Sequence, residues 1–186
     1  MNPAPRHPLV AVCLMDSDES SCDPLRMDTL RMPDVDQVVD FLRATPLLAG
    51  LSDAELADFV FVVELLPVAQ GEAIVREGEK GDAWFLLMEG EARVESRGRV
   101  LKRLTRGDCF GELAVLDGEP RTATVVASSG GLVLRVSWKA FEALLESGSL
   151  AAHKLVLSLT RLLARRMREL LRGAPGHTLE FDGASR

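Results

Sequence analysis

The spacing of apolar side chains predicts two short helices ahead of a β-rich middle. Apolar residues recur at helical intervals between residues 35 and 46. Ser52 and Glu55 then stand at the spacing of a capping box, in which each side chain accepts a hydrogen bond from the other residue's backbone N–H. We therefore expect helices within residues 35–61.

From residue 62 to residue 136 the pattern changes to short apolar or alternating runs separated by glycine-containing turns. The predicted strands are 63–68, 73–76, 83–88, 91–95, 99–104, 122–127 and 132–136. Short strands at this spacing are typical of an antiparallel sandwich or barrel. Trp84 and Phe85 lie in one of these strands, so we expect at least one of them in the core and assign neither a ligand role.

Helical spacing returns after the strands. Ser137 is a plausible N-cap for a helix over 138–146, and a longer helix is predicted from about Ser149 to Arg172, ended by Gly173. The longer helix combines a wide apolar stripe with six cations and one carboxylate, a net charge of +5. We interpret its basic face as a solvated surface opposite a packed one.

Length and composition indicate one domain with appendages. The chain has 186 residues, of which 47% are hydrophobic, enough for a substantial core. Residues 1–34 hold five of the nine prolines, carry six acidic and three basic side chains, and show no sustained period. They predict a flexible N-terminal arm, residues 35–172 a folded domain, and residues 173–186 a disordered tail.

The overall charge argues against an electrostatic nucleic-acid binder, because the net charge is −6 and the isoelectric point is near 5.2. No apolar run reaches transmembrane length, and the start of the chain lacks the features of a secretory signal, so we predict a cytoplasmic protein without a membrane contact. Cys13, Cys22 and Cys109 do not form a disulfide or zinc pattern; Cys109 is interpreted as a core residue.

The strongest chemical signal lies between Phe110 and Val125. Gly111 permits close approach of the backbone to a ligand, and residues 113–116 suit a helical turn that directs free N–H groups at an anion. Glu112 offers an acceptor for a sugar hydroxyl, and the planar fork of Arg121 matches a phosphate. Together these residue types predict a site for a small phosphorylated sugar.

This segment closely resembles the phosphate-binding cassette of the cyclic nucleotide-binding domain family, F-G-E-L-A-x-L-x-x-x-P-R-x-A-x-V. Gly78 to Gly90 also fit that family's G-x-x-G-D pattern. The resemblance implies an α+β fold, an antiparallel β jelly-roll barrel flanked by N-terminal helices and a long C-terminal helix. It implies that Glu112 binds the ribose 2′-hydroxyl and Arg121 the cyclic phosphate. The other implied ligand-binding residues are Gly111, Leu113, Ala114, Thr122 and Ala123.

The favoured function is a stand-alone regulatory module that binds cAMP or cGMP and signals through its C-terminal helix to an unknown effector protein. His7, His153 and His177 all lie outside the predicted barrel, so we expect no metal site, no cofactor, no catalytic residues and no enzymatic activity. Only residues 173–186 follow the long helix, too few for a helix-turn-helix domain. A nucleic-acid-associated transcription regulator without its own helix-turn-helix domain is the alternative.

Two further expectations concern the dimer and the base. The wide apolar stripe of the long helix predicts a homodimer, which Asp at Leu159 and Leu163 should disrupt. The resemblance places a Thr-Ser pair, which contacts adenine in the catabolite activator, at Leu170-Leu171 here. Thr122 supplies a hydroxyl that some relatives use for guanine. We favour cAMP as the ligand, with cGMP bound at comparable strength.

Overall fold

The computed structural model describes residues 32–173, and its first elements are helices α1 (Val35–Ala44) and α2 (Asp53–Val60). Each helix begins with a complete capping box, formed by Asp34 with Gln37 and by Ser52 with Glu55. These reciprocal bonds satisfy backbone N–H groups that would otherwise lack partners at the helix start. The predicted arm and tail fall almost entirely outside the described residues.

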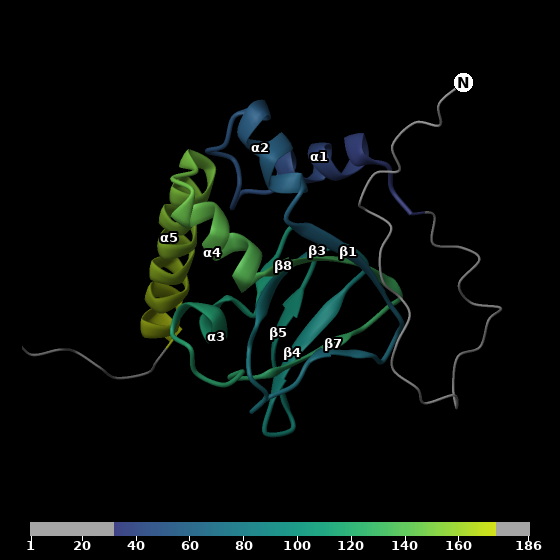
Figure 1. Cartoon of the computed structure of the whole chain (residues 1–186). Helices are drawn as coiled ribbons and strands as arrows, with labels where there is room; N and C mark the ends of the chain where they lie inside the picture. Colours follow the sequence, from purple (N-terminus) through teal and green to yellow (C-terminus); the bar gives the residue numbers. More distant parts are fainter. Residues whose placement is uncertain (1–31, 174–186) are drawn as a thin grey trace, which may run out of the picture.

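The strands form two four-stranded antiparallel sheets, in the orders β1-β8-β3-β6 and β2-β7-β4-β5. Their bounds are β1 (Val63–Val68), β2 (Ala73–Val75), β3 (Ala83–Glu89), β4 (Ala92–Ser96), β5 (Arg99–Leu104), β6 (Cys109–Phe110), β7 (Thr124–Ala127) and β8 (Gly131–Ser137). The predicted fold class is confirmed, since these sheets are flanked by helices at both ends of the chain (Figure 1). Strand β6 was not predicted. Strand β7 begins at Thr124 rather than residue 122, because Thr122 and Ala123 belong to a bend.

Two hydrophobic cores account for the layering. One lies between the two sheets and includes Phe85 and Phe110, whose rings stack with centroids 5.2 Å apart. The other lies between the first sheet and the helices and includes Trp84, which stacks on Phe59 at 6.2 Å. Strand β3 is covered on both faces, which is why six consecutive residues of it are buried. Trp84 and Phe85 are therefore both core residues.

The chain ends in helices α4 (Trp138–Glu146) and α5 (Leu150–Gly173), with the short helix α3 (Glu112–Leu116) lying near α5 (Figure 1). Helix α5 packs Leu155 and Leu159 into the core between the first sheet and the helices. Lys154 of α5 forms an ion pair with Glu55 of α2 at 2.8 Å. Leu159 is 1% exposed, so it faces the domain and not a second copy, contrary to its predicted use at a dimer interface. No helix within residues 32–173 is long and apolar enough to cross a membrane.

Candidate functional site

The cassette turns sharply between strand β6 and helix α3 at Gly111. Gly111 has φ +76°, a left-handed conformation that residues with a Cβ rarely adopt. A Cβ at this position would also lie 2.7 Å from Nη1 of Arg121. The glycine is thus required both by the turn and by the close approach of the arginine side chain.

Arg121 is the buried cation of the site, with an exposed fraction of 6%. Its Nη1 donates to the carbonyl oxygen of Gly111 at 2.6 Å, and its Nη2 donates to the carbonyl oxygen of Ala83 at 2.8 Å. Within residues 32–173 no carboxylate forms an ion pair with it. Burial lowers the pKa of Arg121, and the charge of Asp82 opposes that shift. Among the described residues, the guanidinium is thus oriented by two neutral carbonyl groups and not by a carboxylate.

The loop between β2 and β3, which contains Gly78 and Gly81, holds the backbone of Arg121 through two hydrogen bonds. The backbone N–H of Arg121 donates to the carbonyl oxygen of Glu79 at 2.8 Å, and that of Gly78 donates to the carbonyl oxygen of Arg121 at 2.8 Å. A Cβ at Gly81 would lie 2.5 Å from Cβ of Ala114. Gly78 and Gly81 were not among the predicted site residues, although they are the two glycines of the G-x-x-G-D pattern, which is the signal that could have identified them.

Glu112 is 2% exposed and is bound by a residue that sequence reasoning did not select. Arg166 of α5 donates through Nη1 to Oε1 of Glu112 and through Nη2, at 2.5 Å, to the carbonyl oxygen of Cys109. Burial and the neighbouring charge of Glu112 raise the pKa of the Cys109 thiol well above its usual value, which agrees with its expected role in the core. Arg166 thus joins the long C-terminal helix to the cassette.

The remaining predicted site residues lie close in sequence to Glu112 and Arg121 but differ in exposure. Ala114 is 3% exposed and packs toward Gly81, whereas Leu113 is 40% exposed. Thr122 is exposed and Ala123 is half-buried, both in the bend between Arg121 and strand β7. The structure therefore brings Gly111, Ala114 and Arg121 into direct proximity and leaves Leu113 and Thr122 facing outward.

Within the part of the chain that the structure describes, the cassette coincides neither with a metal site nor with either of two surface cavities. No group of three His, Cys, Asp or Glu side chains among these residues is placed to hold a metal ion. Two open surface cavities, of about 480 and 520 Å³, are lined by α1 with the end of β3 and by α2 with α4 and α5. Neither cavity is lined by the cassette.

Comparison with known proteins agrees with this geometry. Residues 65–147 match the family described as the cyclic nucleotide-binding domain. The chain is 39% identical over 105 residues to cGMP-dependent protein kinase isozyme 1 of Drosophila melanogaster, covering 53% of this chain and 14% of that protein. It is 42% identical over 92 residues to the cAMP-dependent protein kinase regulatory subunit of Mycosarcoma maydis, covering 47% and 18%. The chain thus spans less than a fifth of the length of either relative.

Solved structures give the same result. A structure titled Sp-2Cl-cAMPS bound to PKAR CBD2 is 31% identical, with a TM-score of 0.56 over 70% of this chain and 89% of that chain. The catabolite activator protein of Thermus thermophilus is 32% identical, with a TM-score of 0.60 over 68% and 60%. The two antiparallel sheets, the flanking helices and these matches all agree on one class of domain. The chain belongs to the cyclic nucleotide-binding domain family.

Proposed function

We propose that this protein is a regulatory module, without catalytic activity of its own, that binds a 3′,5′-cyclic mononucleotide at the cassette. The observation that carries the proposal is Arg121, a guanidinium only 6% exposed that has no carboxylate partner among residues 32–173. A buried charge is costly unless it is paired, so an anion is the expected partner. Relatives named for cAMP and for cGMP support a cyclic nucleotide as that anion.

The donors around Arg121 suit a phosphate. A guanidinium has five N–H donors, and the two carbonyls of Gly111 and Ala83 use one hydrogen bond each. The remaining donors, together with the backbone N–H groups of Leu113 and Ala114, serve the phosphate oxygens. Thr122 and Ala123 follow Arg121 directly and complete the proposed ligand contacts.

Glu112 is proposed to accept the ribose 2′-hydroxyl. Arg166 contacts its Oε1, so Oε2 can accept from a ligand hydroxyl without displacing that contact. A carboxylate accepts several hydrogen bonds at once, which makes this sharing chemically reasonable. The nucleotide would then contact the same side chain as α5.

The test is calorimetric titration of the full chain with cAMP, cGMP and 5′-AMP. We expect both cyclic nucleotides to bind, at comparable strength, and Arg121→Ala to weaken binding by about tenfold to a hundredfold, since one charge-assisted hydrogen bond contributes about 1.5–3 kcal/mol. Arg43→Ala, which removes an exposed arginine of α1, is the matched control. Unchanged affinity in a folded Arg121→Ala variant would contradict the assignment of Arg121 to the phosphate.

For its output we propose that ligand binding shifts the equilibrium of α5 between two positions and that α5 acts on an effector protein. The name of the Mycosarcoma maydis relative, a regulatory subunit, supports a partner protein as the receiver of the signal. Arg166, one of the six cations on this helix, contacts the cassette, so part of the basic character of α5 serves the domain itself. We therefore do not propose the nucleic-acid alternative.

We also propose that α5 forms a homodimer through its exposed stripe. Leu150, Leu157, Met167 and Leu171 are 56–63% exposed and follow a heptad spacing along the helix. Leu157→Asp with Met167→Asp should give a monomer by light scattering, whereas Arg165→Asp, at an exposed position of α5 outside this stripe, tests the effect of charge alone. A monomer mass for the parent protein, with and without nucleotide, would contradict the dimer.

A further inference from the structure

Strand β5 forms an open, basic edge that the nucleotide site does not use. It is the last strand of its sheet, and its first five residues are all exposed. Two of them are apolar, Val100 at 56% and Leu101 at 62% exposed. An unpaired strand edge presents free backbone N–H and C=O groups, and it is a place where another extended segment can add.

The charge around this edge is strongly positive in a chain of negative net charge. Residues 93–106 contain six cations and one carboxylate, a net charge of +5, against −6 for the whole chain. Arg93 pairs with Glu95, and Lys102 pairs with Asp108. Three arginines, Arg97, Arg99 and Arg103, form no ion pair with any carboxylate of residues 32–173.

The hairpin that leads into the edge holds an arginine in an unfavourable conformation. Arg97 has φ +50°, and it is the only residue other than glycine in residues 32–173 with a positive φ. Asn, Asp or Gly adopts that conformation at lower cost. The two-residue loop between Ser96 and Arg99 requires positive φ at both of its positions, and this turn places the exposed Arg97 at the tip between β4 and β5.

We propose that residues 16–23 of this chain, Asp-Ser-Asp-Glu-Ser-Ser-Cys-Asp, dock along the edge of β5. This segment has four acidic and no basic side chains, so its charge complements the three unpaired arginines. The occupant is therefore complementary in charge to the edge of β5.

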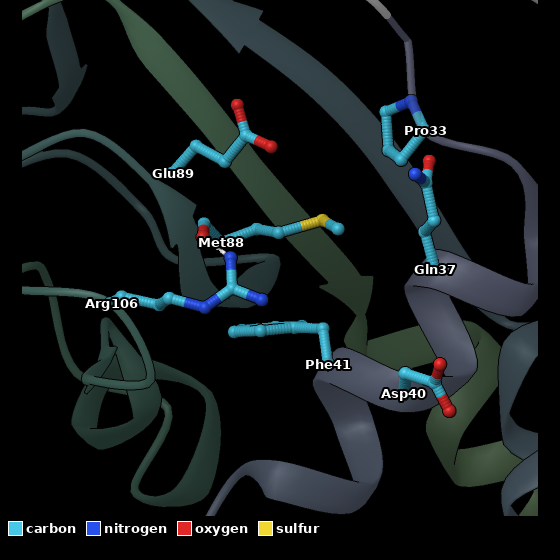
Figure 2. Close-up of a pocket in the computed structure, with 7 residues that line it drawn as sticks. All are labelled: Pro33, Gln37, Asp40, Phe41, Met88, Glu89 and Arg106. Atoms are coloured by element: carbon cyan, nitrogen blue, oxygen red, sulfur yellow. Dashed lines mark hydrogen bonds between the residues drawn. The ribbon is translucent and has the colours of Figure 1, made fainter.

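The described chain starts on the side of the domain from which residues 16–23 would have to reach β5. Pro33 and Arg106 line the same cavity of about 480 Å³, and Figure 2 shows them on opposite sides of it. Arg106 follows the end of β5 by two residues and lies 4.8 Å from the ring of Phe41 in α1. The chain thus enters the domain at Pro33, across this cavity from the residues that follow β5.

The connection is long enough. Ten residues separate Asp23 from Pro33 and span at most about 33–36 Å when extended. The seven-residue separation between Arg106 and Arg99 covers about 23 Å at strand spacing. Because the segment is tethered, its effective concentration is in the millimolar range, so docking requires only about millimolar affinity for the edge.

The test is paramagnetic relaxation in the full chain. A nitroxide is attached to Cys22 in a Cys13→Ser variant; Cys109, at 3% exposed, stays unlabelled. We expect broadening of the backbone amide signals of residues 99–103. The broadening should disappear in the Arg99→Gln, Arg103→Gln variant and at about 1 M salt, where the Debye length is about 3 Å. It should persist in the matched Arg76→Gln, Arg161→Gln variant, which removes two exposed arginines elsewhere.

Two results would overturn the proposal. One is the absence of broadening at β5 at low salt, or broadening that does not respond to the loss of Arg99 and Arg103. The other comes from mixing spin-labelled protein at natural isotope abundance with unlabelled ¹⁵N protein: broadening in that mixture assigns the edge to the arm of another copy. Neither result depends on nucleotide binding.

Discussion

The contact between Arg166 and Glu112 makes a quantitative prediction about stability. Replacing Arg166 by Ala removes a donor from a carboxylate that is 2% exposed, whereas the Arg166 side chain is itself 28% exposed. The loss of one hydrogen bond between charged groups costs about 1.5–3 kcal/mol, and leaving its buried partner unsatisfied adds to that cost. We expect a loss of about 2 kcal/mol in the free energy of unfolding, since part of the pair is solvated.

Chemical and thermal unfolding would measure this loss. For a chain of this size about 1 kcal/mol corresponds to 2–4 °C in Tm, so Arg166→Ala should lower Tm by roughly 4–8 °C. Arg168→Ala, on the exposed side of the same helix, is the matched control and should change Tm by less than about 2 °C.

A double-mutant cycle with Glu112→Gln separates this ion pair from the general packing of α5. Its coupling energy should be about 1–2 kcal/mol, because the two residues share a direct contact. A coupling energy near zero, or a Tm of Arg166→Ala equal to that of Arg168→Ala, would refute the reasoning.

Three other predictions concern single positions. Gly111→Ala should weaken cyclic nucleotide binding at least about tenfold, because the new Cβ meets Nη1 of Arg121 at 2.7 Å and the backbone is left-handed; calorimetric titration measures this loss. Thr122→Ala should cost about 0.5–1.5 kcal/mol in cGMP affinity and little in cAMP affinity if the hydroxyl binds guanine, and equal losses would assign the hydroxyl to the phosphate. The hydrogen bond from Lys154, followed by that from the backbone of Ser52, lowers the pKa of Glu55 from 4.5 to about 2. Because the folded-state pKa is depressed, the stabilising effect is present above pH 4.5 and lost as pH falls toward 2; the Tm difference between wild type and Glu55→Gln should therefore shrink over that range.

Local patterns were sufficient for much of the fold. The capping box of Ser52 and Glu55 marks a helix start because both hydrogen bonds lie within four residues. Strand β6 escaped prediction because a period of two cannot be recognised in two residues. The sequence also did not predict which side of α5 is buried, because its apolar stripe is wide. Only the packing in the structure shows that Leu159 faces the core while Leu157 faces outward.

The site shows the same division between local and distant information. Gly111 and Arg121 stand ten residues apart within one motif, and the motif alone assigned both to one site. Arg166 stands 54 residues from Glu112, among five other cations on the same helix. Nothing in its local sequence distinguishes it from Arg165 or Arg168, because only the rotation of α5 against the domain decides which arginine reaches the cassette.

The position of Arg166 also constrains how α5 could respond to a nucleotide. A ligand shifts a helix only if it binds one helix position better than another. If the ribose hydroxyl takes Oε2 of Glu112 while Arg166 keeps Oε1, the ligand stabilises the α5 position seen here. If the hydroxyl needs both oxygens, the ligand instead releases Arg166, whose Nη2 also leaves the carbonyl oxygen of Cys109. Hydrogen exchange of the α5 amides around residue 166 separates the two mechanisms, because nucleotide increases protection in the first and decreases it in the second.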